Sequence, residues 1–292
     1  MTEHMIKANG VDICTEAFGD PSDPPVLLIM GASASMLMWP ETFCERLAAA
    51  GRFVIRYDNR DTGRSIHYPL GEPEYTVEDM ADDAIGVLDA YGIGKAHIVG
   101  ASMGGMITQQ VALRHRDRVL TITPIMSTPD PGAVLGMLGG GDASGALPGP
   151  SPALLAAALA QAGVDQSDKQ AVIQSRVELF EVLHGPAHPY DEALMRDTFT
   201  REIARDPNFQ STANHQLAIA KTPGWRSRLA SLDVPTLVIH GTADPILPYE
   251  HGVALAKDIA GAELLTMEGV GHEMPEEEMD TIVPAILRHT SS

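Results

Sequence analysis

Three residues of the chain are of the types that together perform nucleophilic catalysis: Ser102, Asp244 and His272. Ser102 is the centre of a Gly-Ala-Ser-Met-Gly segment between an apolar run and a helix-like stretch, so we expect it on a tight strand-to-helix turn. A serine hydroxyl becomes a good nucleophile when a base takes its proton, and a carboxylate must hold that base in the correct tautomer. We predict His272 as the base and Asp244 as the acid, because the order serine, aspartate, histidine matches this turn motif.

The acid has several candidates. Asp244 follows an expected strand at residues 236–240, and the carboxyl ends of parallel strands open onto one crevice. Its Gly-Thr-Ala-Asp loop leaves that strand end directly, which favours it. Three other carboxylates near expected strand ends remain open as rivals, namely Asp130, Asp233 and Glu268.

The base is chosen from eleven histidines. His272 ends a Gly-Val-Gly-His segment after an expected strand at residues 262–267, and a loop of this kind can carry an imidazole toward the serine. His97 and His240 fall inside expected strands, where packing in the core is the simpler interpretation. We therefore predict that His272 is the catalytic histidine.

A tetrahedral intermediate also needs two hydrogen-bond donors for its oxyanion. The N–H of Met103, directly after the serine, is one expected donor, and the N–H of Ala32, after an expected strand at 26–30, is the other. Gly31 would let the backbone of this loop approach closely enough for the Ala32 N–H to serve as a donor. The charged segment at residues 58–65 is interpreted as structural, with Arg60 and Asp61 tying down a loop beside the oxyanion turn rather than touching substrate.

Strand and helix signals alternate at both ends of the chain and predict an α/β protein with a mostly parallel central sheet flanked by helices. We expect strands at 6–18 (a hairpin), 26–30, 53–57, 96–99, 119–126, 236–240 and 262–267. Helices are expected at 41–50, 76–91, from about 103, and at 153–162, 169–183, 190–205, 214–221, 251–260 and 276–289.

The alternation stops between two late strands. Residues 1–130 and 233–292 are therefore predicted to form one core, with a helical cap at 131–232. The start of the cap, at residues 135–152, contains three consecutive glycines and three prolines and cannot hold one regular element.

Composition excludes several classes of function. The 292 residues are 44% hydrophobic and 20% charged, which indicates a globular protein. A net charge of −19 repels phosphate and anionic lipid, so we expect neither nucleic acid nor membrane as a partner. Cys14 and Cys44 lack metal-site spacing and are expected to be buried thiols, and we predict no metal. The first residues lack a signal-peptide apolar stretch, which favours the cytoplasm.

The motifs together resemble the α/β-hydrolase superfamily over nearly the whole chain. They are Gly-Ala-Ser-Met-Gly-Gly, Tyr-Asp-Asn-Arg-Asp-Thr-Gly-Arg-Ser and Gly-x-Gly-His, and the additional Met-Gly-Ala-Ser-Ala-Ser and Met-Trp-Pro segments are most similar to aclacinomycin methylesterases and related macrolide esterases. The resemblance implies a carboxylesterase with the Ser102–His272–Asp244 triad, no cofactor, and a pocket between core and cap. Met30 stands where such enzymes often have histidine, which leaves a main-chain donor unaffected.

The resemblance implies a small-molecule ester or lactone of a bulky polyketide as substrate, and our first expectation is opening of a macrolide lactone, which would inactivate an antibiotic. Alternatives are an anthracycline methylesterase, a serine carbon–carbon bond hydrolase or perhydrolase, and a non-catalytic protein that binds a ligand under its cap. The sequence carries no prediction of oligomeric state. Expected substrate-binding residues are Gly31, His184, Tyr190, His215 and Trp225.

Overall fold

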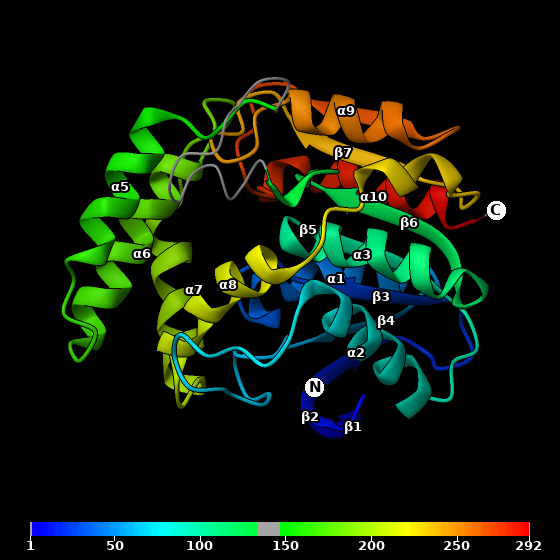
Figure 1. Cartoon of the computed structure of the whole chain (residues 1–292), viewed down its shortest axis with the longest axis horizontal. Coiled ribbons are helices and arrows are strands. Elements are labelled where there is room, and N and C mark those ends of the chain that lie inside the picture. The colour runs from blue at the N-terminus through cyan, green and yellow to red at the C-terminus, as the bar shows by residue number, and fades with distance from the viewer. Residues whose placement is uncertain (1, 133–146, 292) are drawn as a thin grey trace.

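A twisted sheet flanked by helices runs through the protein (Figure 1). The computed structural model describes residues 2–132 and 147–291, and within them eight strands form this sheet in the order β1-β2-β4-β3-β5-β6-β7-β8. The strands are β1 (His4–Ala8), β2 (Val11–Phe18), β3 (Pro25–Ile29), β4 (Phe53–Tyr57), β5 (Ala96–Ala101), β6 (Val119–Ile125), β7 (Leu237–Gly241) and β8 (Glu263–Met267).

Strand direction divides the sheet into two parts. β1 pairs with β2, and β2 with β4, in antiparallel fashion, whereas every pairing from β4 to β8 is parallel. The carboxyl ends of neighbouring strands lie side by side: Ala101 pairs with Ile125, Ile125 with Ile239 two residues before the end of β7, and Gly241 with Met267. The loops that leave β5, β7 and β8 therefore start at the same edge of the sheet, as expected for a parallel arrangement.

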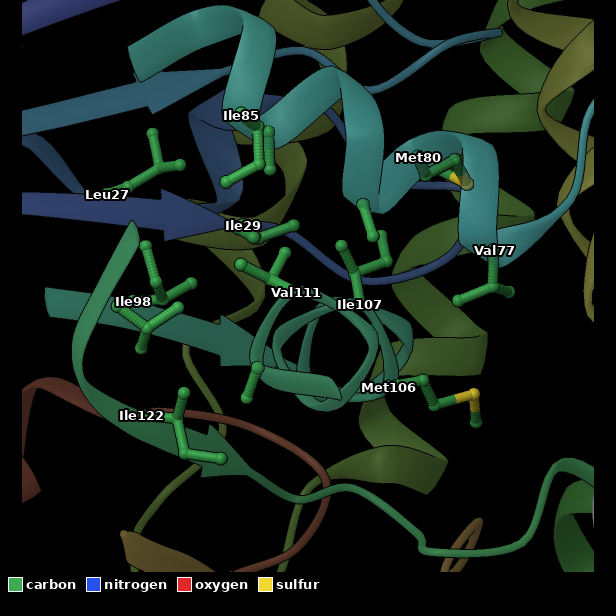
Figure 2. Close-up of a cluster of buried hydrophobic side chains, with 14 of the residues drawn as sticks. Leu27, Ile29, Val77, Met80, Ile85, Ile98, Met106, Ile107, Val111 and Ile122 are labelled. Carbon is green, nitrogen blue, oxygen red and sulfur yellow. The ribbon is translucent and has the colours of Figure 1, made fainter. Parts of the chain in front are cut away.

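Helices cover both faces of the sheet because successive strand residues point to opposite sides. In β3, Leu27 and Ile29 belong to the same apolar cluster as residues of α2 (Val77–Ala90) and α3 (Met103–Arg114), and Figure 2 shows them near Ile85 of α2 and Val111 of α3. The alternate β3 residues pack in the cluster that contains α1 (Glu41–Ala49) and α10 (Met279–His289), and α9 (Glu250–Asp258) contributes to the first cluster. The capping box of Thr76 and Asp79 begins α2.

Between β6 and β7, the described residues include the helices α5 (Pro152–Ala162), α6 (Lys169–Leu183), α7 (Glu192–Arg205) and α8 (Asn214–Lys221). Figure 1 shows α5, α6 and α7 side by side, to one side of the sheet. α6 and α7 have a small apolar core of their own that includes Val177, Phe199 and Ile203. The predicted α/β-hydrolase architecture with a helical insertion between late strands is confirmed, while the exact limits of 131 and 232 stay predictions.

Several local details differ from the expectations. The last helix, expected from residue 276, begins with a short 3-10 turn (Glu276–Glu278) before α10, and the insertion contains two unexpected 3-10 segments, η3 (Phe209–Ala213) and η4 (Arg226–Ser231). Most of the glycine- and proline-rich segment at 135–152 lies outside the described residues. No helix in the described ranges has the length and apolarity needed to cross a bilayer.

Both cysteines are buried free thiols, as predicted. Burial raises the pKa of Cys14 and of Cys44 to about 12. Neither thiol is therefore set up as a nucleophile.

Candidate active site

Ser102 lies on the turn between β5 and α3. Its backbone angles, φ 53° and ψ −117°, are in a region that residues with side chains rarely occupy. The turn is held because the Ser102 N–H donates to Ile125 O at 2.8 Å and Ser127 Oγ–H donates to Ser102 O at 2.9 Å. A strained residue held by its surroundings at a strand end is typical of a functional site.

The glycines around Ser102 are required by close backbone contacts. A Cβ at position 104 would lie 2.0 Å from Ile29 O, and one at position 100 would lie 2.2 Å from Gly104 O. A Cβ at Gly31 would come within 3.0 Å of Ser102 Cβ, so the loop after β3 runs directly against the serine. The structure thus brings Gly31 and Ser102 together.

Asp244 and His272 form a direct hydrogen bond. His272 Nδ1 lies 2.7 Å from Asp244 Oδ2, and Asp244 Oδ1 accepts the N–H groups of Ile246 and Leu247 at 2.9 and 2.8 Å. The Asp244 side chain has no exposed surface. Both carboxylate oxygens are therefore engaged, and a proton on Nδ1 leaves Nε2 of His272 as the basic nitrogen.

A second histidine lies beneath the carboxylate. His240, the fourth residue of β7, places Nε2 3.5 Å from Asp244 Oδ2 and donates to Leu247 O at 2.8 Å. Burial lowers the pKa of His240, so the side chain is neutral at neutral pH. It is packed in the core, as the sequence suggested.

The rival carboxylates are engaged elsewhere. Asp130 accepts the N–H of Gly132, Asp233 forms an exposed ion pair with Arg116, and Glu268 accepts from Thr242 Oγ1 at 3.3 Å. Among these carboxylates, Asp244 is the one that accepts a hydrogen bond from His272. The Ser102 hydroxyl and His272 share no hydrogen bond among the described residues. Catalytic hydrogen bonds are often long in a free enzyme and tighten when substrate binds.

The two expected oxyanion donors belong to residues next to the serine turn: Met103 follows Ser102, and Ala32 follows Gly31, which lies against Ser102. Within the described chain, no recorded hydrogen bond uses the N–H of Met103 or of Ala32, although Met103 is almost fully buried. Buried N–H groups normally have partners, so unpaired donors beside a strained serine favour an oxyanion-binding role. Met103 is also the first residue of α3, whose positive end would favour the same charge.

The loop at residues 30–36, here called the oxyanion loop, is held by side chains from distant segments. Asn59 Nδ2 donates to Met30 O at 2.9 Å, and Asp58 Oδ1 accepts the Met36 N–H at 2.9 Å. Arg60 and Asp61 tie down their own loop by binding Asp83 and Tyr75, as expected, whereas the contacts to the oxyanion loop come from Asp58 and Asn59. Sequence reasoning missed a third support, Glu202 of α7, which is 167 residues from its partner Ser35 and has no local signal.

Two of the expected substrate-binding residues are instead core residues. His215 is fully buried: its Nδ1 accepts the Ser33 N–H at 3.0 Å and its Nε2 donates to Arg60 O at 2.7 Å. Trp225 is 1% exposed, and its Nε1 donates to Gln109 Oε1 at 2.9 Å. Neither side chain has a free polar atom or an exposed surface that could contact a substrate.

The other two cap residues lie near the histidine loop. His184, which follows α6, places Nδ1 2.6 Å from Glu273 Oε2 and Nε2 2.6 Å from His188 O. Burial lowers the pKa of His184, but the bond to His188 and the carboxylate of Glu273 raise it, and its pKa lies above the usual value. The ring of His184 packs against Tyr190, whose hydroxyl donates to Val177 O at 2.7 Å. Both are half-buried, and their polar atoms bind protein groups.

Comparison with known proteins identifies a family and relatives that align along the whole chain. The family model described as alpha/beta hydrolase fold matches residues 24–278. Rhodomycin D methylesterase DauP of Streptomyces sp. strain C5 is 35% identical, over 99% of this chain and 98% of its own. Rhodomycin D methylesterase DnrP of Streptomyces peucetius is 33% identical over the same shares. The solved structure of esterase EaEST from Exiguobacterium antarcticum has a TM-score of 0.79 at 23% identity over 100% of both chains, which shows the fold alone.

The family model spans most of the chain, and two methylesterases align along its full length. The sequence-based expectation of a hydrolase enzyme of the esterase class is confirmed, as is the resemblance to polyketide methylesterases. The chain belongs to the α/β-hydrolase family.

Proposed function

We propose that the protein is a serine-dependent methylesterase that hydrolyses the carboxylic methyl ester of an anthracycline-type polyketide. The observation that carries this proposal is the full-length similarity to two rhodomycin D methylesterases. It favours the alternative of the sequence analysis over our first expectation of macrolide lactone opening. Lactone opening, and with it a role in antibiotic inactivation, stays a prediction that the same experiment tests.

In the first half of the proposed reaction, His272 Nε2 takes the proton of Ser102 while Ser102 Oγ attacks the ester carbonyl carbon. Asp244, 2.7 Å from Nδ1, stabilises the imidazolium that forms. The carbonyl oxygen becomes an oxyanion, which the N–H groups of Ala32 and Met103 receive. When the tetrahedral intermediate collapses, the bond to the methoxy group breaks, and His272 returns the proton so that methanol leaves.

The second half of the reaction repeats these steps with water as the nucleophile. His272 takes a proton from water, the hydroxide attacks the acyl group on Ser102, and the same two N–H groups receive the second oxyanion. Collapse of this intermediate breaks the bond to Ser102 Oγ, which regains its proton from His272. Ester and water are thus converted to a carboxylic acid and methanol.

The test is mass spectrometry of an anthracycline methyl ester and of a macrolide lactone, each incubated with wild type and with Ser102→Ala. We expect the free anthracycline acid and methanol from wild type and no product from the variant. Ser22→Ala, an exposed turn serine, is the matched control and should retain activity. A hydrated macrolide alone would favour lactone opening, and no product from either compound would contradict both assignments.

A further inference from the structure

Glu202, in the cap helix α7, is bonded to the oxyanion loop of the core. Its Oε1 accepts the Ser35 N–H at 2.7 Å and the Ser35 Oγ–H at 2.6 Å. Ser35 Oγ in turn accepts the N–H of Leu37 at 3.2 Å. One carboxylate oxygen therefore sets both the main chain and the side chain of Ser35.

These hydrogen bonds are in an environment that makes them strong. The Glu202 side chain is 4% exposed, and its second oxygen, Oε2, lies 3.4 Å from Arg176 Nη1. Burial raises the pKa of Glu202 above its usual value, although Arg176 and the two bonds from Ser35 act in the opposite direction. Hydrogen bonds to a carboxylate are stronger than neutral ones, and a low local dielectric strengthens them further.

Helix α7 also holds Met36, the next residue of the oxyanion loop, through Asp58. Arg205, one turn after Glu202, forms a 2.6 Å ion pair with Asp58 Oδ2, and Asp58 Oδ1 accepts the Met36 N–H at 2.9 Å. The Asp58 side chain is fully buried. Two consecutive N–H groups of the oxyanion loop, those of Ser35 and Met36, are thus oriented by α7.

The orientation of Ser35 affects Ala32, whose N–H is the expected second oxyanion donor. Ala32 is three residues before Ser35, and between them Ser33 has a left-handed backbone, φ 60°, held by His215 of α8. Gly31 lies against Ser102 at the other end. Because the segment from Gly31 to Ser35 is fixed at both ends, the direction of the Ala32 N–H depends on the contacts at Ser33 and Ser35.

We propose that Glu202 is a positioning residue of the reaction, which holds Ser35 and so aims the Ala32 N–H at the oxyanion of the transition state. This inference rests on the proposed esterase function. Because Glu202 belongs to the cap, it links the cap to catalysis through the oxyanion loop and without contact to substrate.

The experiment compares Glu202→Ala and Glu202→Gln with wild type, using p-nitrophenyl acetate as substrate. Each variant is also tested for binding of a trifluoromethyl ketone, which forms a tetrahedral adduct with the serine and uses the oxyanion donors. Glu192→Gln is the matched control, because Glu192 is an exposed glutamate on the same helix that pairs with Arg196. Thermal unfolding is recorded for every variant.

We expect Glu202→Ala to lower kcat by about 10- to 100-fold with little change in KM, since a misplaced oxyanion donor weakens the transition state alone. Affinity for the ketone should fall by the same factor. Glu202→Gln should recover part of the loss because its amide oxygen still accepts from Ser35. Glu192→Gln should match wild type in all three measurements.

A second variant covers the case in which Glu202→Ala does not fold. Ser35→Ala removes the hydroxyl contact and leaves the N–H contact and Arg176 in place, so we expect a drop in kcat of about threefold at unchanged KM. Wild-type kcat and ketone affinity in both Glu202→Gln and Ser35→Ala would overturn the proposal, as would losses that only follow the melting temperature. An inactive wild type would instead refute the esterase assignment itself.

Discussion

At the scale of single residues, the site depends on how fully Asp244 is bonded. Its two oxygens bind the N–H groups of Ile246 and Leu247 on one side and His272 on the other. A carboxylate held this way has one orientation, so it fixes the tautomer of His272 and leaves Nε2 to act as the base. The nearby strand-end carboxylates bind other groups and offer no such support.

Replacing Asp244 with asparagine should lower kcat by about 10⁴-fold with the fold retained, because the amide favours the wrong imidazole tautomer. Steady-state hydrolysis of p-nitrophenyl acetate measures this. Asp233→Asn is the matched control, since Asp233 is an exposed rival that pairs with Arg116, and it should leave kcat unchanged. A loss of less than tenfold in Asp244→Asn would exclude Asp244 as the acid.

The catalytic candidates could be predicted from the sequence because each lies in the turn or loop that follows a strand. Ser102 and His272 lie in short glycine-containing segments, and such segments have a local signal. Glu202 has none, since its partner Ser35 is distant along the chain and an acidic residue on a helix usually faces solvent.

At the scale of elements, the segment after α6 is packed backbone to backbone against the loop that carries His272. The His272 N–H donates to Leu183 O at 2.8 Å, and the Ala187 N–H donates to Gly269 O at 3.0 Å. A Cβ at Gly271 would lie 2.0 Å from Leu183 O. Cap and histidine loop can approach this closely because a glycine stands at the contact.

Gly271→Ala should therefore displace the histidine loop. We expect a loss of unfolding free energy of about 1–3 kcal/mol and a lower kcat, because the added methyl group overlaps a backbone oxygen that cannot rotate away. Urea unfolding and esterase assays measure the two effects. Gly224→Ala, in a cap position where a Cβ meets open space, should change neither. Equal behaviour of the two variants would show that the contact is loose.

Helix positions in the insertion could be predicted from periodicity, but their inner and outer faces could not. His215 and Trp225 were expected to line a pocket, and both are buried in the core. A large side chain in the insertion leaves the same pattern of apolar and polar residues in the sequence whether it faces a pocket or the core. The substrate could not be predicted for the same reason, because it depends on which side chains of the insertion face the pocket.

At the scale of the whole molecule, burial lowers the pKa of several histidines. They are His97, His215, His240, His251 and His289, and the pKa of His97 falls to about 4. The unfolded chain, with ordinary histidines near 6.5, then binds more protons than the folded chain below that pH. The free energy of unfolding is therefore highest above the histidine pKa of the unfolded chain, and it decreases as the pH falls from there toward the lower pKa of the folded chain.

We therefore expect the free energy of unfolding to fall between pH 7 and pH 5, with about 2 kcal/mol from His97 alone. Urea unfolding at the two pH values measures this. His97→Gln should reduce the fall by that amount, whereas His4→Gln, at an exposed position on β1, should leave it unchanged. A stability independent of pH over this range would contradict the assignment of His97 as a buried neutral histidine.

The central claim, that Ser102 is a nucleophile activated by His272 and Asp244, is tested most directly by a fluorophosphonate probe. Intact-mass spectrometry followed by peptide mapping locates the adduct and gives its rate of formation. We predict one adduct, on Ser102, that is absent in Ser102→Ala and forms far more slowly in Asp244→Asn. Labelling of a different residue, or labelling of Ser102 that is unaffected by Asp244→Asn, would contradict the account.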